Sequence, residues 1–214
     1  MIHPDTELRF VHPEIGFGVV ATRLIPKGTI TWVEDELDQV LTPSRVDSLG
    51  ALYEQMLRKY CFANGRGDYV LCWDLARYVN HSCDPSCLIT AYNFEIAVRD
   101  ILPGEELTDD YATLNIKGSF ECQCGVRQCR RTVLAQDIYT LAERWDSLVR
   151  GAFGLIGSLP QPLWALVDEK AVVQAAVSGA IEVASCKLNV GGYQVEHPVS
   201  DGRTAIDRDG PRKS

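Results

Sequence analysis

Residues 77–87 read Arg-Tyr-Val-Asn-His-Ser-Cys-Asp-Pro-Ser-Cys, and residues 104–111 read Gly-Glu-Glu-Leu-Thr-Asp-Asp-Tyr. The first segment follows residues 69–73, a run with the β-branched and aromatic content of a strand. The second begins after a strand pair that the pattern predicts over 87–92 and 95–99, with a bend between them. Both polar segments are therefore expected to lie at strand ends.

The surrounding sequence predicts a mostly β fold with one inserted helix. Over residues 7–33, short apolar runs alternate with Gly and Pro, which is typical of short strands joined by tight turns. Over residues 43–60, apolar residues recur every three or four positions after an initial Pro, which indicates a helix.

After residue 131 the composition shifts towards Ala, Leu and Val, and a helical extension is predicted over 132–195. Leu134, Ile138, Leu141, Trp145 and Leu148 form a narrow apolar stripe on one helix face. A second helix is predicted over 164–184. Such stripes pack onto the parent domain or form the seam of a homodimer, and both outcomes stay open. Residues 196–214 carry few apolar side chains and are expected to form a mobile tail.

The cysteines indicate a metal site in the segment 116–131. Cys122, Cys124 and Cys129 supply three thiolates to one tetrahedral ion, and the fourth ligand must come from elsewhere. Cys83 is the best candidate for that ligand, and Cys87 is the alternative. The remaining three, Cys61, Cys72 and Cys186, stand alone in apolar surroundings and are expected to be inert.

Composition narrows the class of protein. The 214 residues include 29 acidic and 21 basic side chains, a net charge of −8, and 46% hydrophobic residues. This balance is typical of a folded protein, and no direct nucleic-acid binding is expected from an acidic chain. No long apolar run or secretory signal is present, so no membrane association is expected. The expected location is the cytoplasm, or the nucleus if the protein is eukaryotic. Secretion by a route that needs no signal stays open. The acidity suits a basic partner, although solubility explains it equally.

The three motifs together resemble a known family. Gly16-Phe17-Gly18 alone is a weak signal, because such pairs of glycines are common in hairpins. Followed by the segments at 77–87 and 104–111 and then by the cysteine triplet, it resembles the SET-domain protein lysine methyltransferases with a post-SET zinc motif. The resemblance covers about residues 8–131 and is closest to a minimal, bacterial-like member.

The resemblance implies a SET β-clip fold in which the two polar segments meet as a pseudoknot. It implies a SET domain at 1–115 and a zinc-binding segment at 116–131. The inserted helix would form one wall of the substrate groove. The extension at 132–195 has no counterpart in the motifs.

The resemblance also assigns residue roles. S-adenosylmethionine would contact the backbone of Gly16, Phe17 and Gly18 and the side chains of Asn80 and His81. The active-site tyrosine would be Tyr111. Zinc, held by Cys83, Cys122, Cys124 and Cys129, would be structural, since four thiolates leave no position for water.

The implied reaction is methyl transfer to the amine of an accessible lysine in a protein substrate, and this lysine is expected to lie in a basic segment. The amine must be neutral to react, and a narrow apolar channel lowers the pKa of a lysine. Asp109 departs from the family, which carries Tyr or Phe at this channel position. A carboxylate there would turn outward or bring charge into the channel, and Tyr69 or Trp73 is expected to replace the missing aromatic ring. The alternative function is a catalytically impaired, zinc-stabilised interaction module.

Overall fold

The computed structural model describes residues 1–190. The tail predicted over 196–214 and residues 191–195 of the extension lie outside this range. Most strands of the described residues are short and pair in five small sheets, and the longest helix follows them in the chain. The predicted fold class, mostly β with an insert and a C-terminal helical region, is confirmed.

The N-terminal half contains the strands that the sequence predicts. β1 (Thr6–His12) and β2 (Gly16–Ala21) form an antiparallel hairpin. β3 (Ile30–Val33), β9 (Phe94–Ala97) and β8 (Cys87–Ile89) form an antiparallel sheet in the order β3-β9-β8. The turn between β8 and β9 contains Asn93 at φ +57°, a left-handed conformation that Asn tolerates.

The insert differs from its prediction. Instead of one helix over 43–60, there are two, α1 (Pro43–Ser48) and α2 (Ala51–Tyr60). They are separated at Gly50, whose φ of +74° lies outside the right-handed helical region. The insert also contains a sheet in the order β4-β6-β5, whose three-residue strands are β4 (Gln39–Leu41), β6 (Tyr69–Leu71) and β5 (Cys61–Ala63).

The two polar segments meet in the middle of the domain. β7 (Asn80–His81) pairs in parallel with β10 (Thr108–Asp109). The 3₁₀ helix η1 (Leu75–Tyr78) precedes β7, and η2 (Tyr111–Thr113) follows β10. The cysteine triplet lies between β11 (Ser119–Glu121) and β12 (Thr132–Leu134), which pair as an antiparallel hairpin.

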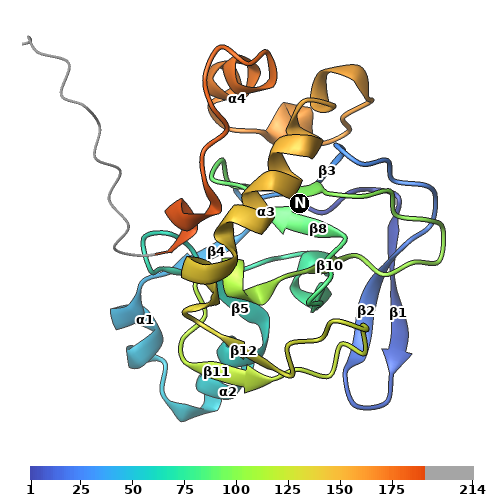
Figure 1. The fold of residues 1–214 in the computed structure, drawn as a ribbon. Coiled ribbons are helices and arrows are strands. Elements are labelled where there is room, and N and C mark those ends of the chain that lie inside the picture. The colour runs from blue at the N-terminus through green and yellow to red at the C-terminus, as the bar shows by residue number, and fades with distance from the viewer. Residues whose placement is uncertain (191–214) are drawn as a thin grey trace, which may run out of the picture.

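The C-terminal region starts with α3 (Asp137–Phe153), which crosses the β-rich part of the molecule (Figure 1). Ile138 and Trp145 of the predicted stripe are buried together with the neighbouring Val149, and the Phe153 ring lies 5.9 Å from that of Phe94 in β9. This part of the stripe therefore packs within the chain, and the homodimer stays a prediction.

The second C-terminal helix is shorter than the predicted 164–184. It consists of η4 (Trp164–Leu166) and, after a break at Glu169 with φ +44°, α4 (Lys170–Val177). Two further 3₁₀ helices, η3 (Ile156–Ser158) and η5 (Cys186–Asn189), flank these elements. Among residues 1–190, every helix is too short or too polar to cross a membrane.

Candidate active site

The parallel pair β7 and β10 brings three distant segments of the chain together. The Ser82 N–H donates to the Asp109 carbonyl at 2.9 Å, and the Ser86 N–H donates to the Thr108 carbonyl at 3.1 Å. On the other side of this segment, the Leu107 N–H donates to Val19 in β2 at 2.8 Å. The hairpin with Gly16–Gly18, the Asn80-His81 pair and the residues before Tyr111 thus form one unit.

Asn80 connects this unit to the glycine hairpin. Its Nδ2 donates to the Phe17 carbonyl at 3.0 Å and to Glu106 Oε1 at 2.6 Å. Because these bonds use both amide protons, the Asn80 Oδ1 oxygen stays available as an acceptor. Beside it lies the Glu106 carboxylate, so the site offers one amide oxygen and one anionic group to a ligand with an ammonium group.

Gly18 is the position where the hairpin and these side chains approach most closely. A Cβ atom there would lie 2.8 Å from Glu106 Cδ and 2.9 Å from Asn80 Nδ2, closer than van der Waals contact allows. Only a glycine leaves both side chains in place.

Replacing Gly18 by Ala is expected to displace Asn80 and Glu106. It should weaken the S-adenosylmethionine binding that the family resemblance implies about tenfold or more, which corresponds to ~1.4 kcal/mol. Isothermal titration of the zinc-loaded protein measures the affinity. Gly154→Ala is the matched control, because a Cβ at Gly154 meets no atom within 4 Å. Equal affinities for the two variants would contradict the assignment of this cradle.

His81 orients Tyr111 rather than facing the hairpin. The Tyr111 N–H donates to His81 Nδ1 at 3.1 Å, and the two rings lie 5.5 Å apart. Burial, and then the positive charge of Arg130, lowers the pKa of His81 to about 4, so the imidazole is neutral at pH 7. Its role in cofactor binding stays a prediction, whereas its contact with Tyr111 is direct.

The Tyr111 side chain is held by its own hydroxyl group, which donates to the Val79 carbonyl at 2.7 Å. Burial, together with the nearby carboxylates of Asp109 and Glu95, raises the pKa of Tyr111 far above its ordinary value. The hydroxyl is therefore neutral at pH 7. Since its proton is used by Val79, the oxygen can offer only its lone pairs to a ligand.

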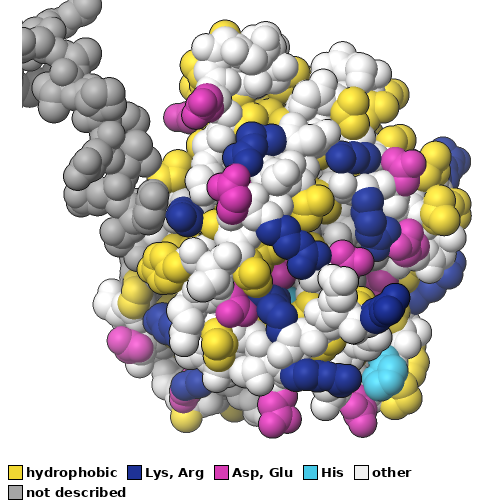
Figure 2. All heavy atoms as spheres, in the orientation of Figure 1, with side chains coloured by type: hydrophobic (Ala, Val, Ile, Leu, Met, Phe, Trp, Pro, Cys, Tyr) yellow, Lys and Arg dark blue, Asp and Glu magenta, His cyan; other side chains and the backbone are white. Residues whose placement is uncertain are grey.

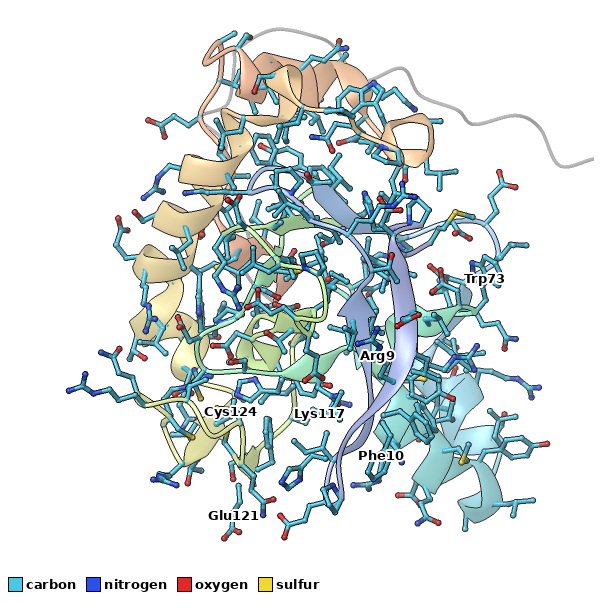
Figure 3. The ribbon with its side chains drawn as sticks, turned by 90° about the vertical axis from the view of Figure 1, so that its right-hand side faces the viewer. Arg9, Phe10, Trp73, Lys117, Glu121 and Cys124 are labelled. Carbon is cyan, nitrogen blue, oxygen red and sulfur yellow. The ribbon has the colours of Figure 1, made fainter. Side chains whose placement is uncertain are left out.

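Tyr111 borders a cavity of about 960 Å³ between the insert and the segment after η2. Tyr69 and Asp109, which were predicted to line the substrate channel, also line this cavity. Trp73 does not: it lies outside the lining, is 41% exposed, and donates its indole N–H to Asp35 at 3.1 Å. In Figure 3, Trp73 lies well apart from Lys117, which does line the cavity. The structure therefore does not bring Trp73 to the place predicted for it.

Asp109 is directed into the protein and is fully buried, so a carboxylate stands where a channel aromatic was expected. Glu95, in β9, lies beside it and is also buried. Burial is the main cause that raises the pKa of both groups, that of Glu95 to about 7, and for Asp109 the charge of Glu95 adds to it. Of the two outcomes considered for Asp109, the carboxyl group does not turn outward, and it lies at the cavity.

The cysteines gather close to β7. Cys83 Sγ lies 3.7 Å from Cys122 Sγ, and the Cys124 N–H faces Cys122 Sγ at 3.5 Å. Cys129 Sγ lies 3.7 Å from the carbonyl oxygen of Cys122. Cys87, the alternative fourth ligand, is instead buried in a separate apolar cluster. Cys83, Cys122 and Cys124 have the chemistry of a structural zinc site, but Cys129 is not in the group of ligand atoms that lie within 4.8 Å of one another. Cys83 with the full triplet as the zinc ligands therefore stays a prediction.

His81 also reaches this cluster, since its Nε2 lies 3.3 Å from Cys83 Sγ and both belong to a group of potential ligand atoms within 4.8 Å of one another. However, His81 Nδ1 accepts the Tyr111 N–H. A neutral imidazole with an accepting Nδ1 carries its proton on Nε2, which then donates to the sulfur. We therefore assign His81 as a residue that orients Cys83 and not as a ligand.

Arg130 joins the cysteine segment to the rest of the site. Its side chain pairs with Asp110 at 2.6 Å and with Asp137 of α3 at 3.0 Å, and its Nε donates to Cys83 Sγ at 3.4 Å. The guanidinium also lies over the Trp145 ring, 5.9 Å from its centroid. One cation thus links the cysteines, the segment before Tyr111 and α3.

Comparison with known proteins agrees with this geometry. Residues 16–112 match the protein family described as SET domain. The match begins at the glycine hairpin and ends next to Tyr111, so it contains β7, β10 and the cradle between them. The match to a SET domain therefore applies to residues 16–112.

Curated proteins that are similar to the chain include histone-lysine N-methyltransferases. The chain is 31% identical over 159 residues to Histone-lysine N-methyltransferase SUV39H1-A of Danio rerio, a match that covers 54% of this chain and 38% of the relative. It is 31% identical to Histone-lysine N-methyltransferase Set2 of Drosophila melanogaster, covering 54% of this chain and 5% of the relative. The chain thus spans well under half the length of these curated relatives.

Sequence reasoning missed three residues of the site. Glu106, the acceptor for Asn80, stands in the second polar segment, and only the approach to Gly18 reveals its role. Arg130 directly follows the cysteine triplet, where its charge could have suggested a partner. One feature of the sequence could have pointed to Glu95, because it is an acidic residue inside a strand whose other three residues are apolar.

Proposed function

We propose that the protein is an S-adenosylmethionine-dependent methyltransferase that acts on a lysine side-chain amine of a protein substrate. The observation that carries this proposal is the β7–β10 pair. Through it, Asn80 lies at the glycine hairpin, while Tyr111 lies at the large cavity. A cofactor site and an amine site therefore adjoin, as a direct transfer between two bound molecules requires.

The cofactor side is argued from the cradle. S-adenosylmethionine carries a methyl group activated by a sulfonium, and its amino-acid portion carries an ammonium group. Asn80 Oδ1 and the Glu106 carboxylate would accept hydrogen bonds from that ammonium. The exposed backbone next to Gly16 and Phe17 leaves room for close approach of the ligand.

The amine side is argued from the cavity and Tyr111. Burial of a lysine in the cavity lowers its pKa towards the neutral form that can attack the methyl carbon. The Tyr111 oxygen, whose proton is donated to Val79, would accept an N–H of the amine and so aim the nitrogen lone pair. The contribution of this residue is orientation, and no strong base is needed in this step.

Incubation of the zinc-loaded protein with labelled S-adenosylmethionine and a panel of core histones and cell lysate tests the proposal. Transfer of label to lysine supports it. Titration of the cofactor alone separates the alternative, a SET-like interaction module without activity, which the buried Asp109 favours. Absence of cofactor binding would leave that module as the better account.

Tyr111→Phe is expected to lower the rate of methyl transfer about 100-fold, because it removes one positioned polar group from the reacting atoms. Affinity for S-adenosylmethionine should stay within about twofold of wild type, since Asn80 and the hairpin are unchanged. Tyr139→Phe serves as a control, because Tyr139 is 62% exposed on α3. A Tyr111→Phe variant with the wild-type rate would contradict the role of this hydroxyl.

The substrate segment is not attracted by an acidic rim. The charged residues that line the cavity are four acidic ones (Asp47, Glu54, Glu95, Asp109) and four basic ones (Arg58, Lys59, Arg77, Lys117). Figure 2 likewise shows Lys and Arg side chains interspersed with Asp and Glu on the face that it presents. Any preference for a cationic side chain must therefore arise inside the cavity, and we propose association with a protein substrate through that interior rather than through net charge.

A further inference from the structure

The floor of the cavity is one face of the sheet β3-β9-β8. Trp32 is the register partner of Glu95, and Glu95 is the register partner of Ile89. Directly opposed residues of antiparallel strands project to the same face. All three residues line the cavity, as does Asp109, so the Glu95 carboxyl group lies on the floor beside an indole and an aliphatic side chain.

Asp109 reaches the same floor from β10, and its two carboxyl oxygens differ in their hydrogen bonds. Oδ1 accepts the Asp110 N–H at 2.6 Å. Oδ2 is buried and receives no N–H donor from residues 1–190, and the one carboxyl group that hydrogen-bonds the Asp109 side chain is that of Glu95. A buried carboxyl oxygen that receives no N–H donor is costly, and the cost is larger when the carboxyl pair carries charge. The oxygen is therefore suited to a donor brought by a ligand.

The pair also lacks a cation. Among the described residues, no Lys or Arg forms an ion pair with Asp109 or Glu95, although four basic side chains line the outer parts of the cavity. Two carboxyl groups this close ionise in coupled steps and hold one proton between them over a range of pH. With one proton, the pair carries a single negative charge in an apolar surrounding, which matches a ligand with a single positive charge.

We propose that Asp109 and Glu95 form a binding site for a primary ammonium group at the floor of the cavity, and that this site selects the charged lysine side chain of the substrate. The inference rests on the proposed function and names the group that recognises its substrate. The ammonium supplies the N–H donors that Asp109 Oδ2 lacks, and Tyr111 lines the same cavity as the pair.

The same oxygen gives the bound ammonium a route to its reactive form. One N–H bond breaks, an O–H bond forms at Asp109 Oδ2, and the electron pair of the broken bond stays on nitrogen. The neutral amine then attacks the methyl carbon, while the C–S electron pair moves to sulfur. The carboxyl pair can return its proton to solvent after the product leaves.

The test compares two small probes that differ in the polar head. NMR titration of the zinc-loaded full chain with n-butylammonium chloride and with 1-butanol measures both affinities, with sodium chloride added to equalise ionic strength. We expect n-butylammonium to bind at least about tenfold more tightly, ~1.4 kcal/mol. Equal affinities for the two probes in the wild-type protein would overturn the proposal.

Asp109→Asn and Glu95→Gln each keep the side-chain shape and are expected to reduce the preference to about twofold or less. Glu54→Gln is the matched control, because Glu54 also lines the cavity but is half-exposed and paired with Arg58. It should keep the wild-type preference. Zinc content and circular dichroism check the fold of each variant. If both folded variants retain the full preference, the carboxyl pair is not the ammonium site.

A lysine-containing peptide as a third ligand separates this inference from the proposed function. Tighter binding of the peptide than of n-butylammonium, lost in the same two variants, supports a protein lysine rather than a free small amine as the ligand. A wild-type protein that prefers n-butylammonium yet transfers no methyl group would support the ammonium site and contradict the methyltransferase. Methyl transfer by a protein that shows no preference for n-butylammonium would support the methyltransferase and contradict the ammonium site.

Discussion

Cys122→Ser is expected to lower the zinc affinity of the protein at least about 100-fold and to remove most of the bound metal during purification. Cys122 is buried at the centre of the cluster, in contact with Cys83 and with the backbone of Cys124 and near Cys129. Without this thiolate, the remaining ligands lose both their common partner and one quarter of the coordination shell.

Loss of zinc should also destabilise the segment between β11 and β12, since metal affinity in such sites is folding free energy. Elemental analysis gives the zinc content, and thermal unfolding gives the change in Tm. Cys61→Ser is the control, because Cys61 lies in β5, outside the cluster, and should retain one zinc per chain. A Cys122→Ser protein that keeps one zinc at wild-type affinity would refute the ligand assignment.

Arg130→Ala is expected to reduce the free energy of unfolding by about 3–5 kcal/mol, the range for removing one partner of a buried ion pair. The Asp110 side chain is only 1% exposed and that of Arg130 is 18% exposed, so solvent does little to screen their interaction. Removing the guanidinium leaves Asp110 buried without its cation and also removes the bond to Asp137 and the contact with Trp145.

Urea unfolding of the zinc-loaded variant measures this effect, and zinc content is measured alongside because Arg130 also donates to Cys83. Arg127→Ala is the matched control, since Arg127 is an exposed residue of the same segment. The expected change for Arg127→Ala is below about 0.5 kcal/mol. If the two variants lose the same stability, Arg130 does not join α3 to the site as we describe.

The strands around the site could be predicted because their signals are local. The bend at Asn93, the strands on either side of it and the hairpin at Gly16 are indicated by turn-forming residues between apolar runs. The prediction of a single helix over 43–60 was wrong for a conformational reason. Periodicity counts apolar positions, and it does not register that Gly50 adopts a positive φ and divides the helix.

Site residues that stand in local motifs could likewise be predicted, whereas those that depend on the direction of a side chain could not. Asn80, Tyr111 and the cysteines stand in motifs whose order can be read along the chain. Trp73 was placed in the channel by its aromatic character, but its indole N–H bonds to Asp35 outside the cavity. A side chain near a site in sequence lies in that site only if the backbone turns it there, and no local signal reports that direction.

By itself, the sequence determined the family resemblance, the strand-rich fold and the segments that meet at the site, because these depend on residue order and short-range patterns. Only the tertiary structure decided that Asp109 points inward to Glu95, that Asn80 bonds to Glu106 and that Arg130 pairs with Asp110. Each of these contacts joins residues 14 to 26 positions apart. Electrostatic and hydrogen-bond energies depend on distance and burial, which are set when β7 and β10 pair and α3 packs across the sheet.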